Sequence, residues 1–523
     1  MEGRGLAKAA TLISLGNIVS RVVGLLRDVT IAHFFGATSA VSAFRTAEFL
    51  PRQFYDLLVG GMISSALVPV LSELAKKDKK LLWQVASLLL SLAVVVLGAG
   101  VLLAELGAPW IAALLGGNDL DLALVTRLLR ITMPAMLFLS LSGILTGLLH
   151  ALRRFTFPAF TAATFNASIV LATLIGVAFF NNGIETVALG LVIGAIAQIL
   201  IQLPGLKDAR LGFQFDLRHP VLSRIGRLYQ PVIVGLLVTL FQTSLDRRLA
   251  NSTGESSLAW MQNATALIQF PMGLVVVAIS LATLPTLSRY AAEAIETGAA
   301  SEAGRRFMAT LTSSLKTVLI LIIPATVALW ILGQPIIALL FEHGDFTPLD
   351  TAQTYLALRF YLLGLIFAAV DQPLIFAYYA RQNTFTPAMV GIISVGVYLA
   401  SVYLPQLVRP LQMTDLVLAD SIKHLGHMVI MLWLINRLSS LRGGGLGVVA
   451  LKSGLAAGLM GLLLWGILAW LSPRLPPVNL LNELLLVGLP ALAGGSLYVI
   501  LIWFMKIEEV SILADLLTQR LKG

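Results

Sequence analysis

The sequence predicts an all-α polytopic membrane protein of about fourteen transmembrane helices, built as two six-helix lobes around a central cavity plus two C-terminal helices. Of its 523 residues, 58% are hydrophobic and only 12% are charged, whereas soluble domains carry about 25% charged residues. Apolar windows of about 20 residues or more, the length that spans a bilayer, recur along the whole chain. A soluble globular fold is therefore excluded, and an internal repeat supplies the two lobes.

Each predicted span is bounded by glycine, proline or a cluster of charged residues. In chain order, the spans lie near residues 9–35, 40–73, 80–106, 121–150, 157–180, 184–204, 220–250, 257–291, 305–333, 349–380, 386–405, 414–437, 446–472 and 480–505.

Successive connecting loops alternate between basic loops and loops whose polar residues are mainly acidic or neutral. The loops of one side hold Lys8, Lys76, Lys77, Lys79, Lys80, Arg153, Arg154, Lys207, Arg210, Arg305, Arg306, Arg381, Arg437, Arg442 and Lys522. The other side holds mainly Asn118, Asp119, Asn181, Asn182, Glu185, Glu255, Glu342 and Asp345, with Arg409 and Arg474 as exceptions. By the positive-inside rule both termini are cytoplasmic, which requires an even number of spans.

Two pairs of similar segments indicate a parallel repeat. ALVPVLSEL (66–74) resembles ATLPTLSRY (282–290), and HALRRFTFPA (150–159) resembles YARQNTFTPA (379–388). Six spans then occur twice, in an N-lobe (1–205) and a C-lobe (220–437), separated by the basic cytoplasmic linker 206–219 and followed by two helices (446–505) and a cytoplasmic tail (506–523). Two such lobes facing each other are typical of transporters whose cavity opens to alternate sides.

The first two spans carry charged residues within apolar sequence. Arg21, Arg27 and Asp28 lie in the first, and Arg45, Glu48 and Arg52 lie in the second at i, i+3 and i+7, on one helical face. A charge at the middle of a bilayer costs about 2.5 to 3.5 kcal/mol on the insertion scale, so these groups must face protein or water. The pattern predicts a cationic, water-filled cavity.

These charges allow two interpretations. Arginine forks match phosphate geometry, so Arg21 and Arg27 are candidates for binding a diphosphate. In the structural alternative, Arg27 forms a salt bridge to an acid such as Glu48, and Arg45 snorkels near the outer end of its helix.

Other classes of function lack their motifs. The basic residues lie in short loops rather than in one domain, so nucleic acid is not expected as a partner. The sequence contains no Walker-type loop, no Ser-His-Asp set, no metal-ligand spacing and no cysteine, and His150, His343 and His424 are isolated in sequence. We therefore expect no enzyme, no cofactor and no metal site.

Three segments resemble one family. SRVVGLLRDVTIAHFFGA (20–37), FEHGDFTPLDT (341–351) and YYARQNTFTP (378–387) are similar to the MurJ (MviN) lipid II flippases of the multidrug/oligosaccharidyl-lipid/polysaccharide exporter superfamily. The resemblance implies a monomer in the bacterial cytoplasmic (inner) membrane that moves lipid II, the undecaprenyl-pyrophosphate-linked peptidoglycan precursor, to the outer leaflet without hydrolysing ATP. Arg21, Gly24, Arg27 and Asp28 match the family's first helix, and the resemblance implies that the two arginines hold the pyrophosphate. It also implies that the helices within 446–505 form a groove for the lipid tail, in contact with membrane lipids.

The sequence departs from that family at several positions. Ser42, Tyr55 and Gly60 stand where the family has an acid, an arginine and an acid, and Thr265 and Ala266 replace its Asp-Arg pair in the eighth span. Gln262, Thr265 and Gln269 remain there at i, i+3 and i+7, a neutral face able to hydrogen-bond sugar or peptide. We expect Arg45 and Arg52 to compensate for the missing charge.

Three acids in later spans are candidates for coupling to a proton or sodium gradient or to the membrane potential. The resemblance implies that Asp246 helps to bind a cation in some members, although Tyr398 replaces the usual Asn partner; alternatively, Asp246 is neutralised by Arg247 and Arg248. Asp420 could take up a proton and pair functionally with Asp246. Asp371 is equally suited to pair with Arg359 or to line the cavity.

Three functions remain open at this level. The first is lipid II flipping by alternating access. The second is flipping of another polyprenyl-linked glycan, such as an O-antigen or exopolysaccharide unit. The third is a non-transporting membrane scaffold. Helix bends during alternating access are predicted at proline and glycine positions: Pro51, Gly60, Gly61, Pro231, Pro271 and Pro373.

Overall fold

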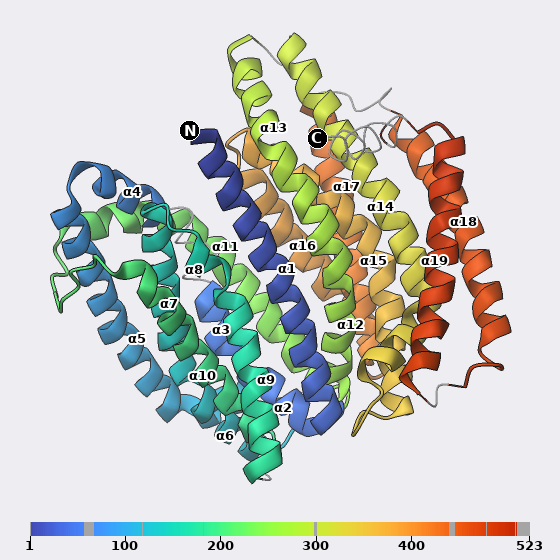
Figure 1. The fold of residues 1–523 in the computed structure, drawn as a ribbon, viewed down its shortest axis with the longest axis horizontal. Helices are drawn as coiled ribbons and strands as arrows, with labels where there is room; N and C mark the ends of the chain where they lie inside the picture. Colours follow the sequence, from blue (N-terminus) through green and yellow to red (C-terminus); the bar gives the residue numbers. More distant parts are fainter. Residues whose placement is uncertain are drawn as a thin grey trace. The chain divides into compact units, whose positions relative to one another are not determined.

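The structure of the protein, a computed structural model, describes residues 2–56, 67–117, 119–180, 183–297, 301–438, 445–476, 479–507 and 509. Gly60, Gly61, Asn118, Asn181, Asn182, Arg442, Lys522 and nearly all of the predicted tail lie outside these residues. Every regular element within them is a helix, as predicted (Figure 1). The chain folds as two compact units, the first formed by Met1–Ala259 with Gly344–Phe346 and the second by Trp260–His343 with Thr347–Gly523. The predicted division into lobes at 206–219 stays a prediction.

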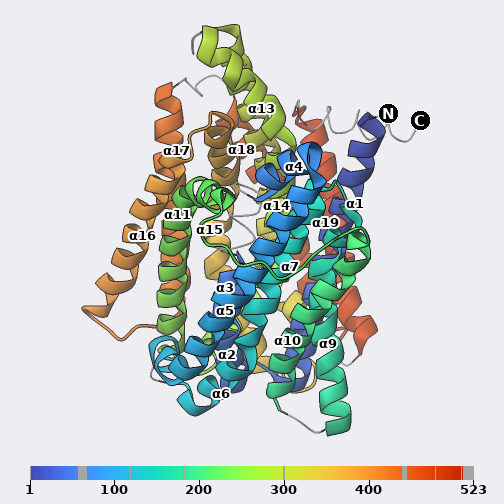
Figure 2. The same ribbon diagram turned by 90° about the vertical axis from the view of Figure 1, so that its left-hand side faces the viewer.

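The first unit packs its helices into one layered bundle around a leucine-rich core. Its elements are α1 (Glu2–Phe35), α2 (Ser39–Ala47), α3 (Phe49–Tyr55), α4 (Val68–Lys77), α5 (Lys79–Leu115), α6 (Leu122–Thr132), α7 (Pro134–Ala151), α8 (Thr156–Ala159), α9 (Thr161–Phe180), α10 (Glu185–Gln202), the 3-10 helix η2 (Leu203–Leu206) and α11 (Pro220–Asn251). Helices α5, α7, α10 and α9 follow one another across the unit, and α1 packs on α9 (Figure 2).

The second unit is centred on α15, which contacts α13, α14 and α17. Its elements are α12 (Ser257–Pro271), which begins just before the unit boundary, the π-helix η3 (Met272–Val276), α13 (Val277–Thr297), α14 (Glu302–Phe341), α15 (Pro348–Ala380), α16 (Phe385–Gln406), α17 (Met413–Leu438), α18 (Leu446–Leu471) and α19 (Leu480–Phe504). Helices α18 and α19 pack on α14 around Met460, Leu464 and Tyr498.

The second predicted span, 40–73, is not one continuous helix. It is interrupted at Glu48, between α2 and α3. Pro51 has no N–H to donate to the carbonyl of Ala47, and that carbonyl instead accepts a hydrogen bond of 3.2 Å from the hydroxyl of Thr132 on α6. The helix is therefore interrupted where proline removes a helical hydrogen bond and a side chain from another helix takes its place.

We expect Thr132→Val to lower the free energy of unfolding by about 1 to 3 kcal/mol, because the buried Ala47 carbonyl would lose its described partner. Thr126→Val on the same helix is the matched control: the Thr126 hydroxyl donates only within its own helix, to Leu122, whereas that of Thr132 is shared between Leu129 of its own helix and Ala47. Thermal unfolding of the purified protein measures both. Equal stability of the two variants would contradict this account of the break.

Other predicted spans differ from the helices in their interiors or ends. The span 121–150 is divided at Met133, where Pro134 begins α7, and 257–291 contains the π-helix η3 directly after Pro271. The predicted ends at 106 and 333 were too early, because α5 continues to Leu115 and α14 to Phe341. Proline thus interrupts or distorts some of these helices and is accommodated in the interior of others.

The internal repeat is visible in the backbone. After α7, Arg153 has φ 57°, its N–H donates to His150 and that of Arg154 donates to Leu149. After α15, Gln382 also has φ 57°, its N–H donates to Tyr379 and that of Asn383 donates to Tyr378. The two segments that resemble each other in sequence therefore form the same turn.

Residues Gly344–Phe346 follow α14 in the chain but belong to the first unit. The Asp345 N–H donates to the carbonyl of His33 at 2.9 Å, near the end of α1. Gly344 has φ +66°, and a Cβ atom at this position would lie 2.1 Å from the same carbonyl. Glycine is therefore required within the segment FEHGDFTPLDT for both backbone conformation and close approach.

Eleven helical stretches in the described part of the chain are long and apolar enough to cross a membrane. They correspond to eleven of the fourteen predicted spans. The other three predicted spans are 9–35, 40–73 and 220–250. The count of fourteen stays a prediction.

Candidate functional site

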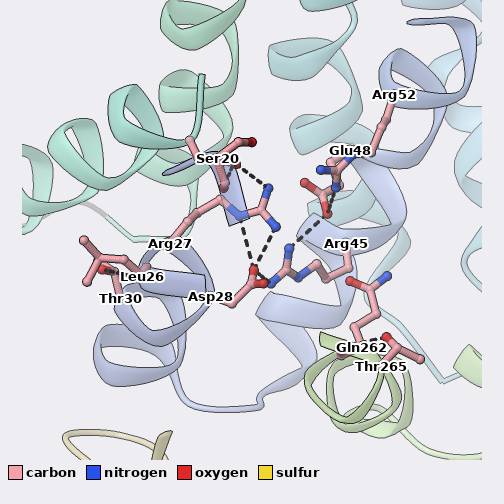
Figure 3. Close-up of polar contacts among 11 residues, drawn as sticks. Ser20, Leu26, Arg27, Asp28, Thr30, Arg45, Glu48, Arg52, Gln262 and Thr265 are labelled. Atoms are coloured by element: carbon pink, nitrogen blue, oxygen red, sulfur yellow. Dashed lines mark hydrogen bonds and ion pairs between the residues drawn. The ribbon is translucent and has the colours of Figure 1, made fainter. Parts of the chain in front are cut away.

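The charged residues of the first two predicted spans meet in one cluster of the first unit. Asp28 is its centre: its Oδ1 accepts hydrogen bonds from Arg27 Nη2 at 2.9 Å and from Arg45 Nη2 at 2.8 Å (Figure 3). Arg27 and Arg45 are both buried. Helix α1 and helix α2 are thus joined by a carboxylate held between two guanidinium groups.

Glu48 extends the cluster toward α3. Its Oε1 accepts a hydrogen bond of 3.0 Å from Arg45 Nη1 and lies 3.8 Å from Arg52 Nη1. The Arg45 side chain is 4% exposed and that of Arg52 is 48% exposed. Arg45 therefore bridges the buried Glu48 and the partly buried Asp28, whereas Arg52 has its guanidinium group at the open side of the cluster (Figure 3).

Helix α9 supports the cluster through Asn166. Its side-chain oxygen accepts a hydrogen bond of 3.1 Å from Arg27 Nη1, and its Nδ2 donates to the Ser20 carbonyl at 3.4 Å. Gly24 lies against the same amide, because a Cβ atom at that position would be 3.3 Å from Asn166 Nδ2. The small residue lets α1 approach α9 closely enough for Arg27 to be held.

Helix α11 supports α2 from a second direction. Arg247 Nη1 donates to the Arg45 carbonyl at 2.8 Å, and its guanidinium group lies 4.6 Å from the centre of the Phe49 ring. Asn251 Nδ2 donates to Thr46 Oγ1 at 2.9 Å. These contacts fix the short helix α2 and hence the place of Arg45.

The cluster brings three arginines together with acids. Arg27, Arg45 and Arg52 face the carboxylates of Asp28 and Glu48, and Asp56 also interacts electrostatically with Arg52. Among the described side chains, Arg45 Nε and Arg247 Nε are buried without a hydrogen-bond partner. Buried polar groups are nearly always hydrogen-bonded, so unused guanidinium donors among several arginines suit the site to an anion.

A polar cavity of about 210 Å³ adjoins the cluster within the first unit. Its polar lining residues are Ser20, Glu48, Arg52, Tyr55, Asp56, Asn166 and Gln198. Arg52 brings a half-exposed cation to this cavity, Glu48 and Asp56 bring acids, and the two amides bring neutral hydrogen-bonding groups. The cavity can therefore accommodate a polar ligand beside the arginine cluster.

The structural alternative for Arg27 is confirmed in kind and wrong in its partner. Arg27 does form a salt bridge to an acid, but the described partner is Asp28 rather than Glu48, because Arg45 pairs with both Asp28 and Glu48. Arg45 does not snorkel, since it is 3% exposed and inside the bundle. Arg21 is half-buried on α1, six residues before Arg27, so helical geometry turns the two arginines to different faces.

The neutral face predicted in the eighth span lies on one helix of the second unit. Gln262, Thr265 and Gln269 are all on α12. The Thr265 hydroxyl donates to the Gln262 carbonyl at 2.9 Å, and Gln269 is exposed. The predicted spacing is therefore realised, and a role in binding stays a prediction.

The three candidate coupling acids occupy different surroundings. Asp246 is half-buried on α11 in the first unit. Asp420, on α17 of the second unit, forms ion pairs with Lys423 and, at 3.7 Å, with His424. Asp371, on α15, pairs with His427 at 2.7 Å and not with Arg359, whose guanidinium group lies over the Trp330 ring. The pairing with Arg359 was wrong because Asp371 faces α17.

Sequence reasoning missed the residues that support these acids and arginines. Asn166, Arg247 and His427 each contact a predicted residue from a distant part of the chain. For His427 a signal was present: Asp420, His424 and His427 are spaced i, i+4 and i+7 on α17 and share one face with Lys423. For Asn166 and Arg247 the sequence has no comparable signal.

Comparison with known proteins gives the family from sequence. The family model described as lipid II flippase MurJ matches residues 31–485. A protein of Vibrio cholerae serotype O1 named "Probable lipid II flippase MurJ" is 30% identical over 407 residues, which cover 74% of this chain and 75% of that protein. A protein of Burkholderia cenocepacia named "Lipid II flippase MurJ" is 28% identical over 401 residues, covering 74% and 76%.

Solved structures agree with the fold. A structure of lipid II flippase MurJ in an inward closed conformation has a TM-score of 0.79 and 24% identity, covering 95% of this chain and 98% of that one. An inward-facing multidrug resistance transporter of the MATE family and MOP superfamily has a TM-score of 0.66 and 15% identity, covering 83% and 99%. With the family model matching most of its length, the chain belongs to the MurJ lipid II flippase family.

Proposed function

We propose that this multi-pass membrane protein is a transporter that flips lipid II from the inner to the outer leaflet of the bacterial cytoplasmic membrane. The observation that carries the proposal is the cluster of Arg27, Arg45 and Arg52 around Asp28 and Glu48, with an unused donor at Arg45 Nε. Intramembrane charges of this kind mark substrate pathways. In a chain of the MurJ family, the diphosphate of lipid II is the anion that suits them.

The arginines would have different roles toward that diphosphate. Arg52, half-exposed beside the polar cavity and only 3.8 Å from Glu48, is the first contact. Arg27 would bind the diphosphate next, because phosphate oxygens can replace the Asp28 carboxylate as acceptors of the hydrogen bonds from the Arg27 guanidinium group. Arg45 positions both acids and stays buried. The site thus exchanges intramolecular carboxylates for substrate oxygens without leaving an arginine uncompensated.

Other parts of the chain complete the proposed cycle. Gln262, Thr265 and Gln269 would hydrogen-bond the sugar or peptide, and the helices within 446–505 would hold the lipid tail. The protein would act as a monomer with both termini in the cytoplasm, alternate its access without a catalytic step or a cofactor, and draw energy from an ion gradient or the membrane potential. Bends at Pro51, Pro271 and Pro373 would accompany the change in access.

Complementation tests the proposal. The chain is expressed in a bacterium depleted of its own lipid II flippase, and survival is scored together with lipid II retained in the inner leaflet. We expect rescue by the natural sequence and loss of rescue by Arg52→Ala, whose half-exposed side chain contributes little to stability. Failure of the natural sequence despite full membrane insertion would contradict lipid II as the substrate and point to another polyprenyl-linked glycan.

A further inference from the structure

The second unit contains a buried histidine-aspartate pair between two of its central helices. His427 Nδ1 on α17 lies 2.7 Å from Asp371 Oδ2 and 2.8 Å from Oδ1 on α15. The two side chains are 12% and 7% exposed. Asp371 lies nine residues before the end of α15, about 14 Å along the helix, so the pair is well inside a candidate span.

Further charged groups surround this pair. On α17, Asp420 lies two turns before His427, and Lys423 and His424 lie one turn before it. Asp420 forms ion pairs with both Lys423 and His424. His424 interacts electrostatically with all four other members, Asp371 and His427 included. We refer to Asp371, Asp420, Lys423, His424 and His427 as the α15–α17 cluster.

The helices around the cluster bring few further charges to it. From α16, the Tyr398 ring lies 5.9 Å from Lys423 Nζ. On α15, Arg359 lies over the rings of Trp330 and Tyr355. The described ionisable contacts of α13 and α14 are elsewhere: Arg289 on Tyr290, Arg306 with Glu302, and Lys316 with Glu509. The charge balance of the cluster is therefore set by its own five members.

That balance is one negative charge when both imidazoles are neutral, because two carboxylates face one lysine. One proton on an imidazole makes the cluster neutral, and a medium of low dielectric favours the neutral assembly. His427 is the residue that would bind this proton. Its Nδ1 donates to Asp371, so Nε2 is the nitrogen that gains or loses the proton. We propose that the α15–α17 cluster is a proton-binding site that takes up one proton at His427.

A proton fits this site better than a metal or sodium ion. Sodium is bound by oxygen ligands, whereas the lysine and the imidazoles place cationic or nitrogen groups among the two carboxylates. No group of three or more His, Asp or Glu suited to a metal occurs in the described part of the chain. Histidine is the side chain that ordinarily changes charge between pH 5 and 8.

The site is placed where its charge can affect helix packing. Helices α15 and α17 approach closely at Gly364, where a Cβ atom would lie 2.7 Å from Ser421, and the Ser421 hydroxyl donates to the Phe360 carbonyl at 2.7 Å. Protonated His427 adds an ion pair across the same interface, and its deprotonation leaves a buried net charge there. The coupling of this change to transport rests on the proposed function.

The protonation itself is measured first, on the full chain in lipid nanodiscs with ¹⁵N-labelled histidine. The chain has six histidines, and His427→Gln identifies the signal of His427. We expect this imidazole to take up one proton as the pH falls, and Asp371→Asn to lower the midpoint of that uptake, because the opposite charge is lost. His150→Gln, on α7 outside the cluster, is the control and should retain the uptake at His427.

A His427 signal that keeps one protonation state from pH 5 to 8, or a midpoint unchanged by Asp371→Asn, would overturn the proton site. Coupling is measured separately as lipid II flipping in proteoliposomes with and without a pH gradient. We expect at least a fivefold response in the natural sequence and in His150→Gln, and none in His427→Gln. Arg52→Ala should lose flipping at every pH yet keep the titration, so failure of the proposed substrate site and failure of the proton site give different results.

Discussion

Replacement of Arg27 by alanine is expected to reduce lipid II flipping at least about 100-fold. The fork of Arg27 makes two hydrogen bonds to Asp28 and one to Asn166, and in the proposed cycle the diphosphate takes the place of Asp28. Hydrogen bonds to charged groups contribute about 1.5 to 3 kcal/mol each, so the loss of two corresponds to about 3 kcal/mol or more, or two decades in rate. The measurement is lipid II flipping by the purified variant in proteoliposomes.

Two further variants make this result specific to the site. Arg27→Lys keeps the charge but not the planar fork, and we expect it to retain intermediate activity. Arg127→Ala removes an arginine of the same unit whose side chain is 67% exposed and pairs with Glu185 at the surface, and it should flip at the natural rate. Flipping at the natural rate by a folded Arg27→Ala protein would contradict the role of this cluster in diphosphate binding.

Replacement of Arg45 by methionine is expected to lower the free energy of unfolding by about 3 to 5 kcal/mol, because removal of one partner from a buried ion pair leaves uncompensated charge. Arg45 is the shared partner of Asp28 and Glu48, and all three lie within the bundle. Unfolding in bicelles, followed by steric trapping, measures the difference. Arg52→Ala should change stability by less than about 1 kcal/mol, since its side chain is half-exposed.

A triple variant separates lost charge balance from lost packing. Asp28→Asn, Glu48→Gln and Arg45→Met together remove the two acids and the arginine between them, so most of the stability lost in Arg45→Met should return. Flipping should stay abolished, because the position of Arg27 depends on Asp28. A triple variant no more stable than Arg45→Met would show that packing of the Arg45 stem, rather than its charge, stabilises the first unit.

The helical architecture was predictable because it depends on chain length and polarity. Eleven predicted spans match candidate membrane-spanning helices, and the repeat of 150–159 in 379–388 corresponds to two turns with the same hydrogen bonds. Helix interruptions were not predictable in the same way. The break at Glu48 combines Pro51, visible in the sequence, with a hydrogen bond from Thr132, which only the packing of α6 provides.

The candidate site was predicted in part. Arg27, Asp28, Arg45, Glu48 and Arg52 were expected on apolar helices, and they do form one cluster. The equal treatment of Arg45 and Arg52 was wrong, because the short helix α2 buries the first and α3 exposes the second. Asp371 was expected to pair with Arg359 or to line the cavity, and its partner His427, fifty-six positions away, was not identified.

The sequence by itself determined that this chain is a bundle of apolar helices carrying buried charges, and its motifs determined the family, because hydrophobic length and residue spacing are local properties. Only the tertiary structure decided which charges are paired: Asp28 with Arg27 and Arg45, and Asp371 with His427. Ion pairs depend on distances of a few ångströms between residues far apart in the chain. Those distances are set by helix packing.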